Sequence, residues 1–299
     1  MITVLGSINM DLIASVDRLP DPGETVGGHA FVTAAGGKGA NQALAAGRGG
    51  AAVRMCGAVG RDHFAEPALT HLKEAGVDLS AIREVDEATG TALILVDSNG
   101  ENIIAVVPGA NGTISDDDAI RAVEAMSEGD YLLLQLEIPA SAIRAALSKA
   151  RERGVISVLN IAPLTDDAAE LAAGADIVIA NETEFELLAG KSEMGAAVRE
   201  KALLDLHGKS EQTLIVTLGA GGVIAARGGA LLKAPGLIIE PVDTVGAGDT
   251  FCGYLAAGLD RGQSFETALK RAAIAGSLAC LKPGAQPAIP HEKDVKAAP

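Results

Sequence analysis

The segment DTVGAGDTF, residues 243–251, places two glycines, a carboxylate and a helix start close together. Gly246 and Gly248 have no Cβ, so a ligand can approach their backbone N–H groups closely. The apolar spacing that follows predicts a helix beginning near Asp249, whose first amides lack partners within the helix. Asp249 then either caps this helix or takes a proton from a substrate hydroxyl while the amides hold a transferred phosphoryl group.

Two segments near the N-terminus carry candidate contacts for a small polar ligand. In GSINMD, Asn9 and Asp11 share one face of an extended strand, where they can bind adjacent sugar hydroxyls or form an Asx-type turn. In GGKGANQA, Gly37 precedes an Ala-rich helix, with Lys38 and Asn41 near its first turn as candidate donors. Lys38 is not followed by Ser or Thr, so this segment is not a Walker-type phosphate loop.

Acids and glycines also follow three later apolar runs. Glu137 comes after residues 131–136 and is either a ligand contact or a loop charge. In NETE, residues 181–184, a carboxylate suits Mg²⁺ held through water; the alternative is compensation of a helix dipole, the role assigned to Glu182 and Glu186. The glycine run of TLGAGGV, residues 217–223, fits either a nucleotide's ribose and phosphates or a tight hairpin turn.

The elements that position these residues follow from alternating apolar patterns. Strand-like runs lie at 2–5, 53–58, 131–136, 156–159, 177–180 and 214–218, and helical patterns lie between them at 40–47, 64–75, 116–126, 140–153 and 196–206. This alternation predicts an α/β fold with a mostly parallel central sheet flanked by helices. Ligands of such sheets bind at the carboxyl ends of the strands.

Two segments, 12–35 and 89–108, interrupt this alternation within what is otherwise a single α/β domain over residues 1–299. The first carries turn residues, and the second is an alternating hairpin with Asn99-Gly100 at its tip. We expect both to form a small separate sheet. Such a sheet is either a lid that excludes water from the site or a pair of surface hairpins without a catalytic part.

Composition limits the classes of partner and compartment. With 299 residues, 48% of them hydrophobic, the chain can bury a sizeable core, and its net charge of −15 argues against nucleic-acid and anionic-membrane partners. Three cysteines without close pairing and five histidines without ligand spacing favour neither disulfides nor zinc. No leader or long apolar segment is evident, so a cytoplasmic protein is expected.

Taken together and in this order, GSINMD, GGKGANQA, NETE, TLGAGGV and DTVGAGDTF resemble the ribokinase branch of the phosphofructokinase-B carbohydrate kinase family, from Met1 to about Pro290. GAQPAIP, residues 284–290, is similar to the C-terminal tail of that branch. The resemblance implies an ATP-dependent kinase that phosphorylates the 5-hydroxyl of D-ribose to give D-ribose 5-phosphate and ADP, with Asp249 as general base. The residues that would contact the sugar are Asn9, Asp11, Gly37, Lys38, Asn41, Glu137 and Asp249.

The resemblance also implies the remaining site residues. Those of the anion hole would be Gly246, Ala247 and Gly248, and those that hold ATP would be Asn181, Thr217, Gly219, Gly222 and Gly248. Glu184 would organise Mg²⁺ through water. A K⁺ ion would lie, mostly against backbone carbonyls, beside Asp243, Val245, Ala279, Lys282 and Gly284. Val245 and Ala288 stand where the family commonly has a hydroxyl, which predicts a less selective cation site. A homodimer, with each lid sheet covering the partner's site, is implied as well.

Other functions stay open at this point. A kinase of the same family could act on 2-deoxyribose, fructose or a nucleoside, although the polar residues of GSINMD and GGKGANQA favour a small polyhydroxy sugar. A non-catalytic sugar or nucleotide sensor would be expected to lose Asp249 or the glycines beside it, and all are present. A nicotinamide-dependent oxidoreductase would need a first-strand dinucleotide fingerprint that this chain lacks.

Overall fold

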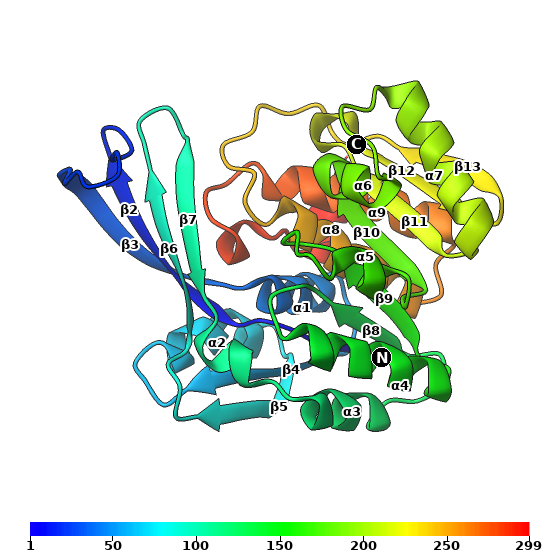
Figure 1. The fold of residues 1–299 in the computed structure, drawn as a ribbon, viewed down its shortest axis with the longest axis horizontal. Helices are drawn as coiled ribbons and strands as arrows, with labels where there is room; N and C mark the ends of the chain where they lie inside the picture. Colours follow the sequence, from blue (N-terminus) through cyan, green and yellow to red (C-terminus); the bar gives the residue numbers. More distant parts are fainter. Residues whose placement is uncertain (299) are drawn as a thin grey trace.

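The computed structural model describes residues 1–298 and has a large sheet between two helical layers, with a smaller sheet projecting from one side (Figure 1). Within these residues the large sheet has nine strands in the order β13-β12-β11-β10-β9-β8-β1-β4-β5. Pairing is parallel from β11 to β5, and β12 and β13 add an antiparallel hairpin at one edge. The strands are β1 (Ile2–Leu5), β4 (Val53–Gly60), β5 (Asp78–Val85), β8 (Tyr131–Leu134), β9 (Ile156–Asn160), β10 (Ile177–Asn181), β11 (Thr213–Thr217), β12 (Val223–Arg227) and β13 (Ala230–Ala234).

The helices cover both faces of this sheet (Figure 1). They are α1 (Lys38–Arg48), α2 (Ala65–Glu74), α3 (Asp116–Glu124), α4 (Ala140–Arg153), α5 (Ala168–Ala172), α6 (Glu182–Ala189), α7 (Ala196–Ser210), α8 (Ala247–Asp260), α9 (Phe265–Ala279) and α10 (Glu292–Ala297). Alternate residues of one strand enter different cores: Ile177 and Ile179 pack with α1, α8 and α9, whereas Val178 packs with α3 to α7. The predicted α/β fold with a mostly parallel sheet is confirmed.

A four-stranded sheet, in the order β3-β2-β6-β7, stands apart from the large one (Figure 1). Its strands are β2 (Asn9–Val16), β3 (Gly28–Gly36), β6 (Gly90–Val96) and β7 (Asn102–Val107). The β2–β6 pair is parallel and the outer pairs are antiparallel, because β2 and β6 leave the main body side by side. The second sheet expected from the sequence is therefore present, and β2 carries Asn9 and Asp11 at the end nearest the main body.

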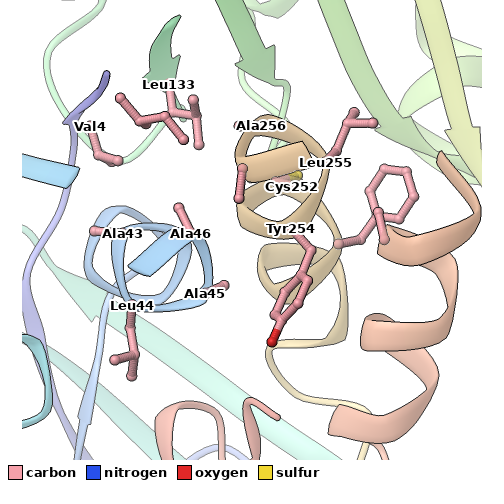
Figure 2. Close-up of a cluster of buried hydrophobic side chains, with 14 of the residues drawn as sticks. Val4, Ala43, Leu44, Ala45, Ala46, Leu133, Cys252, Tyr254, Leu255 and Ala256 are labelled. Carbon is pink, nitrogen blue, oxygen red and sulfur yellow. The ribbon is translucent and has the colours of Figure 1, made fainter. Parts of the chain in front are cut away.

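Close packing of α1 against α8 fixes the centre of the molecule. Figure 2 shows alanines of α1 and the residues Cys252, Tyr254, Leu255 and Ala256 of α8 in one buried cluster with Val4 and Leu133. A Cβ added at Gly253 would lie 2.5 Å from both the Cβ of Ala45 and the carbonyl oxygen of Gln42. Because only glycine allows this approach, side chains near the start of α1 can reach the first turn of α8. No helix within residues 1–298 has the length and apolar character needed to cross a membrane.

Candidate active site

Predicted site residues gather where the parallel strands end. A cavity of about 200 Å³ opens there beside the first turn of α8. It brings together residues expected to bind the sugar, the nucleotide, the metal and the transferred phosphoryl group: Lys38, Asn181, Glu184, Thr217, Gly246, Gly248 and Asp249. Asn9, Asp11, Gly37, Asn41 and Glu137 lie outside its lining, on the side of α1 and the small sheet. The cavity is thus bounded by the carboxyl ends of β10 and β11 and by the starts of α1 and α8.

The first turn of α8 has no side-chain cap. The N-cap residue is Gly246, in the left-handed region with φ 76°, and a Cβ at this position would meet Ala285 at 3.0 Å. Asp249 lies in the first turn, and its carboxylate is turned away from the helix end toward α1. The capping interpretation of Asp249 is therefore wrong. The N-terminus of α8 keeps its partial positive charge for a ligand.

Two amides of α1 hold the Asp249 carboxylate. Asn41 Nδ2 donates to Asp249 Oδ2 at 3.0 Å, and Gln42 Nε2 donates to Oδ1 at 3.0 Å. Asn41 is only 5% exposed, and its Oδ1 is buried without a hydrogen-bond partner among the described residues. A buried acceptor without a donor is costly, so this oxygen is poised to receive a hydrogen bond from a ligand hydroxyl.

The anion-hole residues differ in how free their amides are. Ala247 N–H donates to Thr244 O at 3.3 Å, so this amide is already engaged. Gly248 lines the cavity, and a Cβ added there would meet no atom within 4 Å. The open space above Gly248 makes its backbone the most accessible part of the predicted anion hole.

Lys38 is the cation of a strongly acidic site. Its pKa is raised chiefly by Asp249 and also by Glu137 and Glu184. Glu137 holds the start of α1, since its Oε2 accepts from the Lys38 N–H at 3.1 Å and from Ser7 Oγ. Glu137 thus anchors the loop that presents Lys38. Its role as a sugar contact stays a prediction.

Asp11 lies at the base of the small sheet among other acids. Burial, followed by the charges of Glu137 and Asp249, raises the pKa of Asp11 from 3.8 to about 6. A carboxyl whose pKa is raised on folding binds its proton more tightly in the folded state, so it opposes folding increasingly as pH rises from 3.8 to about 6 and fully above that range. Asp11 therefore destabilises the ligand-free protein at neutral pH, as residues kept for binding often do.

We expect Asp11→Asn to raise the free energy of unfolding at pH 8 by about 1–3 kcal/mol, the range set by a shift of about two pKa units. The gain should shrink as pH falls from 8 to 5, because wild-type Asp11 then becomes protonated in the folded state. Urea unfolding at several pH values measures this difference. A gain that is the same at pH 5 and pH 8 would contradict the assignment.

Asn9 depends on a residue that sequence reasoning missed. Asn111, in the 3₁₀ turn Gly109–Thr113 after β7, donates to Asn9 Oδ1 at 2.7 Å and also binds both backbone groups of Ile8. Asn9 is 2% exposed and is therefore fixed in orientation. The signal for Asn111 was present in the loop PGANG, where a polar residue follows the hairpin.

The predicted nucleotide residues lie at the ends of two adjacent strands. Asn181 caps α6, accepting from Glu184 N–H at 2.8 Å while Glu184 Oε2 accepts from Asn181 N–H at 2.7 Å. Thr217 ends β11; Gly219 begins an exposed 3₁₀ turn, and Gly222 is buried against Ala234. The glycine run therefore forms the turn between β11 and β12.

Glu182 and Glu186 were both predicted to compensate the dipole of α6, and the structure supports this position for Glu182 alone. Glu182 lies in the first turn, where it also forms an ion pair with Arg199 at 2.7 Å. Glu186 lies one turn later, and its carboxylate accepts from the N–H groups of Glu193 and Met194. Its assignment to the helix dipole is wrong, because α6 begins at Glu182 and the loop after α6 folds back onto Glu186. Burial raises the pKa of Glu184.

Asp243 joins the two segments predicted to hold a monovalent cation. Its Oδ1 accepts from Val245 N–H at 3.0 Å, and its Oδ2 accepts from Gly284 N–H at 2.8 Å. Ala279 ends α9 and is buried, whereas Lys282 is exposed in the loop that follows. The structure therefore brings Asp243, Val245 and Gly284 together beside the N-terminus of α8.

Gln42 and Asn160 are further site residues absent from the predicted set. Gln42 follows Asn41 in GGKGANQA, and Asn160 ends β9 in the same way that Asn181 ends β10. Applying the rule that ligands bind at the carboxyl ends of strands to every strand would have found Asn160. Gln42 could not be found this way, since its role depends on the approach of α8.

Comparison with known proteins agrees with this arrangement. The family described as "pfkB family carbohydrate kinase" matches residues 1–292. The chain is 37% identical to a ribokinase of Haemophilus influenzae over 294 residues, covering 98% of this chain and 96% of that protein, and 32% identical to a deoxyribokinase of Salmonella typhi, covering 97% and 95%.

A solved structure shows the same relation. The structure of Arabidopsis thaliana ribokinase complexed with ribose and ATP superposes with a TM-score of 0.88 at 33% identity, covering 99% of this chain and 97% of that one. The family resemblance found in the motifs is thereby confirmed. The chain belongs to the pfkB family of carbohydrate kinases.

Proposed function

We propose that this protein transfers the γ-phosphoryl group of ATP to the 5-hydroxyl of D-ribose, giving D-ribose 5-phosphate and ADP. The observation that carries the proposal is the position of Asp249. Its carboxylate is held by Asn41 and Gln42, facing α1, within the first turn of an uncapped helix. A base for the sugar hydroxyl and a site for the phosphoryl anion therefore lie side by side. The similarity to proteins named ribokinase supports ribose as the acceptor.

In this mechanism Asp249 accepts the proton of the sugar hydroxyl as its oxygen attacks phosphorus. The N–H groups at the start of α8, Gly248 foremost, stabilise the charge on the transferred group, and Lys38 adds a positive charge beside it. Asn9, Asp11 and Asn41 orient the sugar, with the free Asn41 Oδ1 as one acceptor. Most of the catalysis is then positioning and electrostatic stabilisation.

The donor set fits a magnesium ion held indirectly. Glu184 is a buried oxygen donor that lines the same cavity as Asp249 and Lys38, and one of its oxygens is committed to the start of α6. Because Mg²⁺ keeps most of its water ligands, a carboxylate acting through water suits it. The ion would neutralise charge on the ATP phosphates.

A K⁺ ion is proposed to act next to the anion hole, beside Asp243, Val245, Ala279, Lys282 and Gly284. We place the activity in the cytoplasm, where ATP is available.

The main alternative acceptor is 2-deoxyribose, since a deoxyribokinase is among the relatives. We would measure ADP formation from MgATP with ribose, 2-deoxyribose, fructose and adenosine, each with K⁺ or Na⁺ as the monovalent cation. The proposal predicts the highest kcat/KM on ribose and stimulation by K⁺. Higher kcat/KM on another acceptor would reassign the substrate while leaving the mechanism, and no turnover with any acceptor would favour a sensor.

We further propose that the four-stranded sheet is a lid and that two copies of the chain associate through it. The face that carries Asp11 also exposes Val32, Ile104 and Val106, and the opposite face exposes Phe31, Leu93, Ile103 and Val107. Apolar surface on both faces of one projecting sheet is unusual for a monomer. A second copy packed against the sheet would cover it.

Phe31→Glu with Ile103→Glu should convert the dimer to a monomer, because both charges would be buried in the interface. Light scattering after gel filtration measures the mass of each form. A matched control is Leu164→Glu, since Leu164 is equally apolar and 43% exposed but lies outside this sheet. A wild-type protein that is monomeric at micromolar concentration would contradict the proposal.

A further inference from the structure

A chain of three buried amides lies directly behind Asp249. Gln135 Nε2 donates to Gln42 Oε1 at 2.7 Å, and Gln42 Nε2 donates both to Asp249 Oδ1 at 3.0 Å and to Asn160 Oδ1 at 3.2 Å. Asn160 Nδ2 donates in turn to the carbonyl of Ile179 at 3.2 Å. Side chains from α1, from β9 and from the residue that follows β8 are thus linked to the first turn of α8.

The chain has a fixed polarity. The backbone carbonyl of Ile179 can only accept, so Asn160 must direct its NH₂ group there and its oxygen toward Gln42. Gln135 donates to the oxygen of Gln42, which leaves both N–H groups of Gln42 for its two acceptors. A reversed Gln42 amide would point its oxygen at the Asp249 carboxylate. The network therefore admits one orientation of Gln42.

Burial separates Gln42 from any ligand. Gln42 is 1% exposed and Gln135 is fully buried, and neither lines the cavity beside Asp249. The Gln135 oxygen lacks a partner among the described residues and sits where a Cβ at Gly6 would lie 2.0 Å away. Retaining a buried amide that is only partly satisfied is costly, so packing alone does not account for it.

We propose that Gln42, oriented by Gln135 and Asn160, is a positioning residue that aims the Asp249 carboxylate at the reacting hydroxyl. This inference rests on the proposed function of Asp249. Asn41 and Gln42 both donate to the Asp249 carboxylate. Asn41 also has a free oxygen that can accept from the sugar, whereas Gln42 has none. Loss of Gln42 should therefore affect the chemical step and leave sugar binding nearly unchanged.

The first test is Gln42→Met, which keeps the side-chain length and removes the donor. We expect kcat to fall about 10- to 100-fold, the order of effect of misplacing a catalytic group by about 1 Å. The Kd values for ribose and for MgATP, measured by calorimetry, should stay within about threefold. Gln135→Met, which frees Gln42 to rotate, should lower kcat in the same way but less, and serves if Gln42→Met does not fold.

The matched control is Gln212→Met. Gln212 is a half-buried amide that donates to the carbonyls of Ala172 and Ala175, far from Asp249. Its loss should lower thermal stability and leave kcat unchanged at temperatures where the protein is folded. If Gln42→Met and Gln212→Met both lowered kcat in proportion to their loss of stability, a structural role would explain the effect of Gln42→Met and the proposal would fail.

Gln42→Glu gives a readout that a structural role does not produce. When the new carboxyl is protonated, its O–H can donate to Asp249 Oδ1; when it ionises, two carboxylates face each other. The variant should therefore lose activity as pH rises through a range where wild type does not. A pH profile parallel to that of wild type, or Gln42→Met within threefold of wild-type kcat, would overturn the inference. If wild type turned over no acceptor, the proposed function itself would fail.

Discussion

Asp249→Asn is expected to lower kcat by about 100- to 10,000-fold, because a positioned general base contributes about 10²- to 10⁴-fold. Asparagine has nearly the same shape, and its oxygen can still accept from Gln42. MgATP should therefore bind with a Kd within about threefold of wild type. Stopped assays of ADP formation with ribose, together with calorimetric titration of MgATP, measure both quantities.

The control for Asp249→Asn is Asp11→Asn. Asp11 is also a carboxylate of the sugar side, but in this account it binds substrate without taking a proton. Its loss should raise KM for ribose more than it lowers kcat. If Asp249→Asn retained activity within tenfold of wild type, the base would have to be another group.

Gly248→Ala should lower kcat/KM on ribose by about 100-fold without destabilising the protein. The added methyl meets no atom of the protein within 4 Å, so the fold accommodates it, and alanine is the better helix former by about 1 kcal/mol. The same methyl enters the space where the phosphoryl group is expected, and loss of one anion-hole contact costs about 10²- to 10³-fold. Thermal unfolding and steady-state kinetics measure the two effects.

Gly208→Ala is the matched control for that substitution. Gly208 lies within α7, is exposed, and has equally open space at its Cβ position, but it is remote from the cavity. It should gain similar stability at no cost in activity. A Gly248→Ala variant as active as Gly208→Ala would show that no ligand approaches the α8 N-terminus.

The sequence predicted the parts of the fold that have strong local patterns. The runs at 2–5 and 177–180 and the helix at 140–153 coincide with β1, β10 and α4 to within a residue. β5 was missed because DLSAIREV is a partly exposed edge strand whose charges break the apolar run. β12 and β13 were missed because each has only five residues and they follow a glycine run that was predicted to be a ligand loop or a tight turn; that run makes the turn after β11.

The site was predictable where a residue's role depends on its own strand or helix. Lys38, Asn181, Glu184 and Asp249 were named from motifs and line one cavity. Roles that depend on contact between distant segments were not predictable from spacing. Asn111 reaches Asn9 across 102 positions, and Gln42 reaches Asp249 across 207. The same limit left the capping role of Asp249 undecided until the approach of α1 to α8 was known.

The most direct test of the account is the product of wild-type turnover. Wild-type protein incubated with ribose and MgATP would be followed by phosphorus and carbon NMR, which identify both the phosphorylated species and the position of the new ester. The account predicts ADP and D-ribose 5-phosphate in equal amounts. ADP with inorganic phosphate alone, or phosphate attached to another hydroxyl of ribose, would contradict it.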